Sequence, residues 1–156
     1  MKEKVLEALA NLGFKLNEEE GPEYGFTYEG LNLLYLYNEN DEDFLNISLP
    51  GILEIEEGKA LQACALIEKI NSTLKYVKAY AIGNNVWLFY ERELFGEEDL
   101  MAVISRMILH LEAAMAFARR AMAEIEAADE EEDDEADAEE MDNEDNNAYT
   151  EDGEDD

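Results

Sequence analysis

The sequence LKYVKAYAIGNNVWLFYER, residues 74–92, contains two apolar runs separated by a tight-turn signal. We predict strands over 74–82 and 86–92, because aromatic and β-branched residues are enriched in strands. The intervening Gly83-Asn84-Asn85 favours a hairpin, since glycine and asparagine tolerate positive φ angles. Alternation along the second strand places apolar side chains on both of its faces: Val86, Leu88 and Tyr90 on one, Trp87 and Phe89 on the other.

Three more strands are predicted upstream of this hairpin, over residues 24–29, 31–37 and 44–49. All three runs are rich in aromatic and aliphatic residues, and Gly30 and the polar run 38–42 separate them. This pattern is typical of a three-stranded antiparallel meander. The strand over 31–37 is again apolar on both faces.

Apolar residues recur at helical spacing in the remaining segments of the body. Residues 2–12 and 57–71 each carry one apolar stripe. A long helix is predicted to start at Glu97-Glu98-Asp99, where acids complement the helix dipole, and to run to about Ala127. The order α-β-β-β-α-β-β-α predicts an α+β fold, with an antiparallel five-stranded sheet and helices packed on one face.

The acidic residues are unevenly distributed along the chain. Residues 1–123 hold all 11 basic residues and 21 of the 41 acids, whereas residues 124–156 hold 20 acids and no base. A segment with so few apolar residues cannot offset the entropy of ordering itself, and its charges repel one another. We therefore predict a folded domain over 1–128 and a disordered acidic tail over 129–156.

The composition excludes several classes of partner. A net charge of −30 is incompatible with the cationic surface that nucleic-acid binding needs, and anionic membranes would repel the chain. The apolar runs are shorter than a bilayer span, and no signal-peptide pattern opens the chain. The single cysteine cannot form an internal disulfide. We therefore expect a cytoplasmic protein that binds neither nucleic acid nor membranes.

Residues that carry chemistry are scarce. His110, the sole histidine, lies between leucines in the predicted long helix, and Cys64 has alanine neighbours that indicate a small core residue. The sequence contains no Gly-rich phosphate loop, no nucleophile elbow and no zinc-ligand cluster. We expect a non-enzymatic protein without cofactor or metal. An enzyme of another type would need a pocket at His110 with a neighbouring carboxylate.

Helices on one side can cover only one of the two apolar sheet faces. An uncovered apolar face usually marks an interface, and exposed aromatic residues supply much of the energy of interfaces. The residues predicted to bind a partner are Tyr35, Tyr37, Trp87 and Phe89. The alternative is that a longer helix or the curl of the sheet buries these strands on both sides.

Apolar residues in the long helix recur at alternating steps of three and four. This spacing predicts a heptad seam that could pair two chains as a homodimer. The seam residues are Ile108, Leu111, Met115, Ala118, Met122 and Ile125. The alternative is an ordinary amphipathic helix that covers the sheet of its own chain.

The element order and two local patterns resemble the YbjN-like family of bacterial proteins. The patterns are FLNISLPG at 44–51 and, further along, KAY at 78–80 followed by VWLFYE at 86–91. The resemblance covers about residues 1–125. That family is similar in fold to the class I chaperones of type III secretion. The resemblance implies a protomer that tends to homodimerise, that binds an extended or helical polypeptide along its sheet, and that has no catalytic residues.

The leading hypothesis is therefore a protein-binding module that receives a polypeptide segment on its apolar sheet surface, by helix docking or by strand addition. The alternative is an electrostatic role, in which the acidic tail binds a basic protein. Binding of that second kind would need residues 129–156 and would be lost at high salt.

Overall fold

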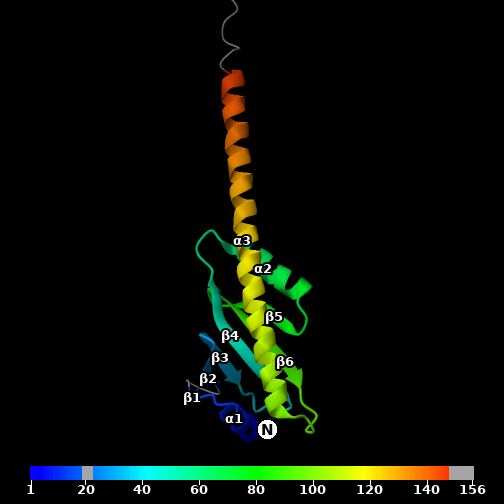
Figure 1. Cartoon of the computed structure of the whole chain (residues 1–156). Coiled ribbons are helices and arrows are strands. Elements are labelled where there is room, and N and C mark those ends of the chain that lie inside the picture. The colour runs from blue at the N-terminus through cyan, green and yellow to red at the C-terminus, as the bar shows by residue number, and fades with distance from the viewer. Residues whose placement is uncertain (19–22, 148–156) are drawn as a thin grey trace, which may run out of the picture.

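Helices and strands follow one another through residues 1–18 and 23–147, the part of the chain that the computed structural model describes (Figure 1). The helices are α1 (Lys2–Asn11), α2 (Ala60–Thr73) and α3 (Leu100–Asn147). The strands are β1 (Asn17–Glu18), β2 (Glu23–Tyr28), β3 (Leu31–Leu36), β4 (Phe44–Glu54), β5 (Val77–Ile82) and β6 (Asn85–Glu93). The predicted α+β class is confirmed.

Within these ranges the strands form one six-stranded sheet in the order β1-β2-β3-β4-β6-β5, and every neighbouring pair is antiparallel. The prediction of five strands is therefore wrong. The additional strand, β1, pairs Asn17 with Gly25 and Glu18 with Tyr24. Because β1 has two polar residues, it carries none of the apolar alternation by which a strand is found in a sequence.

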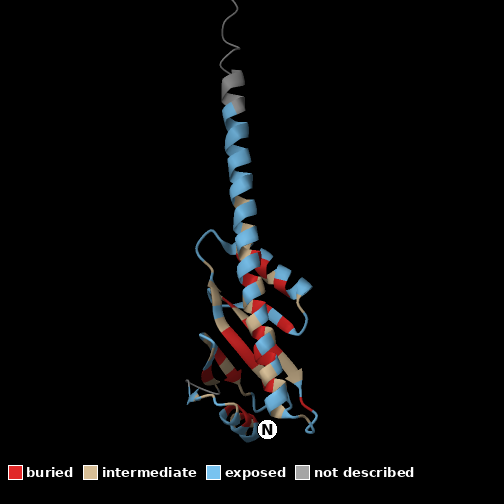
Figure 2. Cartoon of the chain, in the orientation of Figure 1, coloured by how far each residue is buried: buried red, intermediate tan, exposed pale blue. Residues whose placement is uncertain are grey.

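All three helices pack on one face of the sheet, which we call the covered face. Tyr35 pairs with Ile47, and Ile47 pairs with Tyr90, so these three side chains share that face. All three are buried, and they form one core with apolar residues of α1, α2 and α3. Figure 2 shows the buried positions of α3 along the part of the helix that crosses the sheet.

The buried stripe of α3 supplies a large share of this core. Its members recur at steps of three and four, and all are 4% exposed or less: Ile104, Met107, Leu111, Ala114, Ala118 and Ala121. Burying a Leu, Ile or Met side chain stabilises a fold by roughly 1.5–3 kcal/mol. The alanines let the helix lie close to the sheet and to α2.

The start of α3 is fixed by one side-chain cap from Asp99, the last of the three acids predicted to begin the helix. The Asp99 carboxylate accepts a hydrogen bond from the Ala102 N–H at 3.3 Å, and the helix begins at Leu100. Glu98 precedes the helix, and its carboxylate accepts bonds from the N–H groups of Phe95 and Gly96 at 2.6 and 2.9 Å. These bonds, that from Phe95 above all, lower the pKa of Glu98.

The far end of α3 also differs from the prediction. The helix continues through 129–147 instead of ending near Ala127, so the expected disorder from Asp129 is not confirmed there; residues 148–156 lie outside the described part of the chain. Glutamate and alanine are strong helix formers, which favours this continuation although like charges four residues apart oppose it. Asp129 still contacts the body, through Gln62 Nε2 at 2.8 Å and Lys59 Nζ at 3.8 Å.

We expect Leu111→Ala to lower the free energy of unfolding by about 2–5 kcal/mol, because it leaves a cavity beneath α3 where Leu111 is fully buried. Leu109→Ala is the matched control, since Leu109 lies on the same helix and is 53% exposed. It should change stability by no more than about 0.5 kcal/mol. Urea unfolding followed by circular dichroism measures both, and equal effects would contradict the packing of α3 described above.

We expect Glu98→Gln to destabilise the protein in a pH-dependent way. The folded chain holds the pKa of Glu98 below its ordinary value of 4.5, so the charged form contributes stability above that pH. The contribution is lost as pH falls through the lowered pKa. Urea unfolding at several pH values should therefore show a difference between wild type and variant that is largest near neutrality and disappears in acid. A difference independent of pH would contradict this role.

Candidate functional site

The second face of the sheet, which we call the open face, carries no helix in the described part of the chain (Figure 1). The strand register identifies its side chains. Leu34 pairs with Ser48, Ser48 with Phe89, and Phe89 with Lys78, so one row of side chains crosses four strands. Neighbouring rows add Leu36, Asn46, Tyr80, Trp87 and Glu91.

Three aromatic side chains form a cluster on the open face, where they project from the edge strand β5 and its neighbour β6. The Tyr80 ring stacks on Phe89 with ring centroids 4.2 Å apart and an interplanar angle of 5°, and Trp87 lies 5.9 Å from Phe89 on centroids. Phe89 is only 2% exposed although no helix covers it, whereas Tyr80 is 42% exposed and Trp87 is half-buried. The cluster therefore shields its own centre and presents Tyr80 and Trp87 to solvent.

Polar side chains border this aromatic cluster. Glu91 accepts hydrogen bonds from Asn46 Nδ2 and Lys78 Nζ, each at 2.8 Å. Two buried oxygens on the same face, Asn46 Oδ1 and Ser48 Oγ, have no hydrogen-bond partner within the described residues. Because the one basic residue of this group is paired with Glu91, its charge is largely neutralised. The open face is thus aromatic over β5 and β6 and nearly neutral where Lys78 and Glu91 pair.

The four aromatic residues predicted to bind a partner lie on opposite faces of the sheet. Trp87 and Phe89 are on the open face, but Tyr35 is on the covered face. Tyr37, just past the end of β3, packs against the same core as Tyr35. Tyr35 is 2% exposed, and its burial raises the pKa of its hydroxyl. Tyr37 donates a hydrogen bond to Glu42 at 2.9 Å, which raises the pKa of Tyr37, and the Lys2 ammonium lies 5.2 Å from its ring centroid.

The assumption that these four residues share one exposed surface is therefore wrong. Both faces of β3 are apolar, so its sequence does not show which face the helices cover. The residue that completes the aromatic cluster, Tyr80, was missed. Its signal was present in the hairpin, because a tight turn at Gly83-Asn84 sets Tyr80 opposite Trp87.

The predicted dimer seam packs mainly within its own chain. Ile108, Leu111 and Ala118 are buried against the core, and Met115, Met122 and Ile125 lie at the border of the buried stripe, half-buried. The alternative, an amphipathic helix that covers the sheet, therefore describes this part of α3. Pairing two chains through Leu111 would first require its removal from the core.

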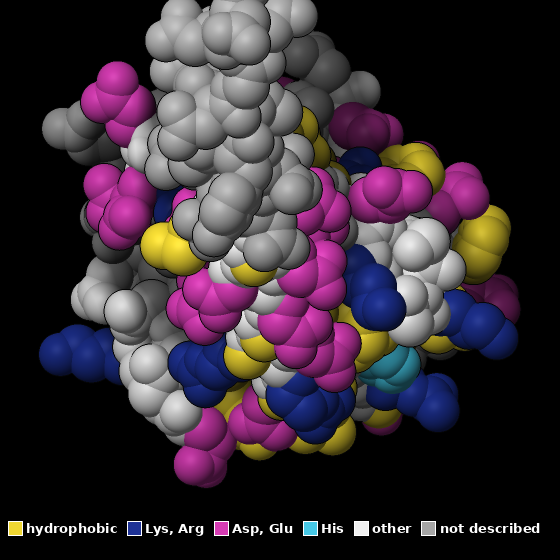
Figure 3. Space-filling view, turned by 90° about the horizontal axis from the view of Figure 1, so that it is seen from above, with side chains coloured by type: hydrophobic (Ala, Val, Ile, Leu, Met, Phe, Trp, Pro, Cys, Tyr) yellow, Lys and Arg dark blue, Asp and Glu magenta, His cyan; other side chains and the backbone are white. Residues whose placement is uncertain are grey.

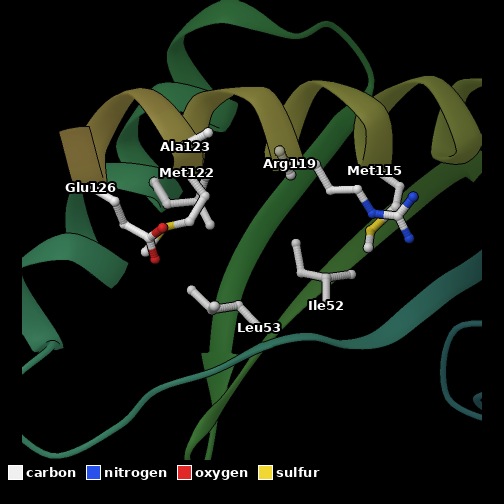
Figure 4. A pocket seen from close by; sticks show the side chains of 9 residues that line it. Ile52, Leu53, Met115, Arg119, Met122, Ala123 and Glu126 are labelled. Atoms are coloured by element: carbon white, nitrogen blue, oxygen red, sulfur yellow. The ribbon is translucent and has the colours of Figure 1, made fainter.

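A cavity of about 260 Å³ lies between α2, α3 and the end of β4. Figure 4 shows Ile52 and Leu53 of β4 facing Met115 and Met122 of α3, with Arg119 and Glu126 among the lining side chains. A second cavity of about 290 Å³ lies between the end of α1, β2 and α3, and it is lined mostly by apolar side chains, including Phe14 and Leu109. Apolar linings of this kind suit contacts with hydrocarbon groups.

His110 and Cys64 are the two residues whose side chains could carry chemistry. The His110 ring lies edge-on to Tyr76 and Tyr90, with centroids 5.4 and 5.7 Å away, and its Nδ1 is 2.8 Å from the Arg106 carbonyl oxygen. Cys64 is exposed, so its assignment to the core was wrong; the neighbouring Ala63 faces the core instead. Over residues 1–18 and 23–141, whose side chains the structure describes, no group of three or more His, Cys, Asp or Glu side chains is placed to hold a metal ion.

By length and composition alone, one 18-residue window of α3, within Leu100–Met141, is apolar enough to cross a membrane. The expectation that the apolar runs fall short of a bilayer span stays a prediction. Helices that pack on a protein core have the same composition, and Ile104, Met107 and Leu111 of this stretch belong to the core. The packing of α3 on the sheet thus accounts for its apolar side.

Comparison with known proteins relates this architecture to solved structures. YbjN from E. coli, a proposed transcription regulator, superposes with a TM-score of 0.60 at 12% identity, over 77% of this chain and 92% of YbjN. The chain has a YbjN-like fold. An uncharacterised protein from Methanothermobacter thermautotrophicus also superposes on this chain, with a TM-score of 0.55 at 16% identity, over 79% of this chain and 96% of that protein. No family model and no curated protein matches the sequence.

At these identities the likeness to YbjN shows the fold alone. It confirms the YbjN-like fold that the resemblance of residues 44–51, 78–80 and 86–91 implies. The similarity to secretion chaperones stays a prediction.

Proposed function

We propose that this YbjN-like protein is a non-enzymatic protein-binding module that takes an apolar polypeptide segment on its open face. The observation that carries the proposal is the cluster of Tyr80, Trp87 and Phe89, which lies on a sheet face without a covering helix. Tryptophan and tyrosine are enriched among the residues that dominate interface energies. Exposed apolar patches bordered by polar residues often mark sites of protein interaction.

The edges of the sheet favour binding across the face over strand addition. At one edge, β1 offers only two residues for pairing. At the other edge, the Asn71 side chain bonds to both the N–H and the C=O of Ala79 in β5, at 2.7 and 3.0 Å. A strand added to β5 would need these backbone groups. We therefore favour a partner segment that lies over the aromatic cluster.

The charge of the chain favours a partner segment with basic residues next to its apolar ones. Residues 1–123 carry ten more acids than bases, and 129–147 add 13 acids. Seen along α3, acidic side chains gather on the helix and basic ones lie around it (Figure 3). This field attracts cationic segments and repels acidic ones. The acidic extension would then steer the partner toward the body.

A role in regulation through protein binding is compatible with the description of YbjN as a proposed transcription regulator. It is equally compatible with the predicted similarity to secretion chaperones, which bind polypeptides. The alternative, an acidic segment that binds a basic protein by charge alone, differs in needing no aromatic cluster. Homodimerisation, a cytoplasmic location, and action without cofactor, nucleic acid or membrane stay predictions.

Trp87 is the only tryptophan of the chain, so its fluorescence reports directly on the open face. We expect a 15-residue peptide of leucine and lysine to shift Trp87 emission to shorter wavelength, because the peptide excludes water from the indole. A leucine and glutamate peptide should cause no shift. Tyr80→Ser should weaken binding of the leucine and lysine peptide at least tenfold, which corresponds to about 1.4 kcal/mol.

Leu61→Ser is the matched control, because Leu61 is 82% exposed on α2, away from the open face. It should bind the peptide as wild type does. Equal effects of the two variants would contradict the assignment of the open face. A peptide of serine and lysine that binds as tightly, is released by 500 mM salt and fails to bind a chain ending at Glu130 would establish the electrostatic alternative instead.

A further inference from the structure

The exposed edge of β5 is closed by one side chain of α2. β5 is an edge strand of the sheet. The backbone N–H and C=O groups of alternate residues bond to β6, and those of the residues between them point away from it. The N–H and C=O of Ala79 belong to the outward set, because the Asn71 amide occupies both. A primary amide has the same donor and acceptor as a peptide bond, so Asn71 stands where the backbone of a further strand would be.

The rest of the β5 edge has the features of a strand that could pair with a further strand. Ala81, two residues after Ala79, also directs its backbone groups outward, and it is exposed. Exposed apolar side chains lie beside these groups on β5, namely Tyr80 at 42% and Ile82 at 44%. Proteins commonly protect an edge with a lysine, but the lysine of this strand, Lys78, is engaged by Glu91 at 2.8 Å.

We infer that the β5 edge is a pairing surface for β5 of a second copy of this chain, and that Asn71 keeps it closed in the folded protein. Residues 77–82 contain no acid in a chain of net charge −30, so two β5 strands can approach without acidic side chains facing each other along the contact. A two-fold axis at Tyr80 sets Ala79 of one copy opposite Ala81 of the other, and each such pair exchanges both backbone bonds.

This arrangement also uses the exposed aromatic ring of the strand. With the axis at Tyr80, the two tyrosine side chains lie directly opposite each other on the open face, where cross-strand aromatic pairs stabilise a sheet. The Val77 N–H, which bonds to the Lys75 C=O at 2.8 Å in the turn where Tyr76 has a φ of 68°, stays outside the new contact. Only the two bonds of Asn71 have to be given up.

Asn71→Ala tests this inference in the full-length protein, because alanine keeps the helix and removes both bonds. Asn71→Ser, whose hydroxyl cannot reach both groups of Ala79, is a second variant that keeps a polar side chain. Sedimentation velocity should show that each variant self-associates at least tenfold more tightly than wild type. The control Ser72→Ala, at the next position of the same helix, should sediment as wild type does.

A proline at residue 81 identifies the surface used. Ala81→Pro removes an outward N–H without removing a bond to β6, so the double variant with Asn71→Ala should return to the wild-type sedimentation profile. Hydrogen exchange should show the Ala79 amide unprotected in dilute Asn71→Ala and protected again at high concentration. Folded Asn71 variants that sediment as wild type does, or association that persists with Ala81→Pro, would overturn the inference. Neither result depends on the peptide binding proposed above.

Discussion

The contact between the buried stripe of α3 and the sheet is the one on which the rest of the structure depends. Ile104, Met107 and Leu111 join α3 to a core that includes residues of β3, β4 and β6. Because α1 and α2 pack on the same side, all three helices cover one face of the sheet. The other face therefore stays open, and Tyr80 and Trp87 are exposed on it.

This one-sided cover leaves one face of the sheet available to a partner. A sheet with apolar residues on both faces requires two layers of cover to be isolated from water. The second layer is absent from the described chain, and we propose that a partner polypeptide supplies it. The edges of the sheet offer few free backbone groups to a partner, because β1 is short and the Asn71 side chain occupies backbone groups of β5. Binding over the face and closure of the edge are thus complementary features of the same sheet.

The sequence predicted those parts of the fold that local signals encode. The hairpin of β5 and β6, the meander of β2 to β4 and the three helices follow from apolar periodicity and turn residues. β1 was not predicted, because a strand of two polar residues shows no apolar alternation. The start of α3 differs from the prediction because Asp99 caps the helix from outside. Its end differs because the helix propensity of glutamate and alanine favours continuation against charge repulsion.

The sequence predicted only part of the candidate site, because it does not show which face of each strand the helices cover. Alternation separates Tyr35 from Leu34 and Trp87 from Leu88, yet it does not say which set the helices cover. Only the register from Tyr35 through Ile47 to Tyr90 settles this, and register joins residues far apart in the sequence. The same holds for Asn71, whose role depends on where α2 ends relative to β5.

The exposure of Trp87 in the protein alone is the most direct test of the open face. Acrylamide suits this purpose because it is neutral, and the net charge of −30 would repel an anionic quencher. The account predicts that acrylamide quenches Trp87 to the degree expected of a half-buried indole, and equally at all protein concentrations. A Trp87 that is fully protected, or that becomes accessible only on dilution, would show that the face is already covered and would contradict the account.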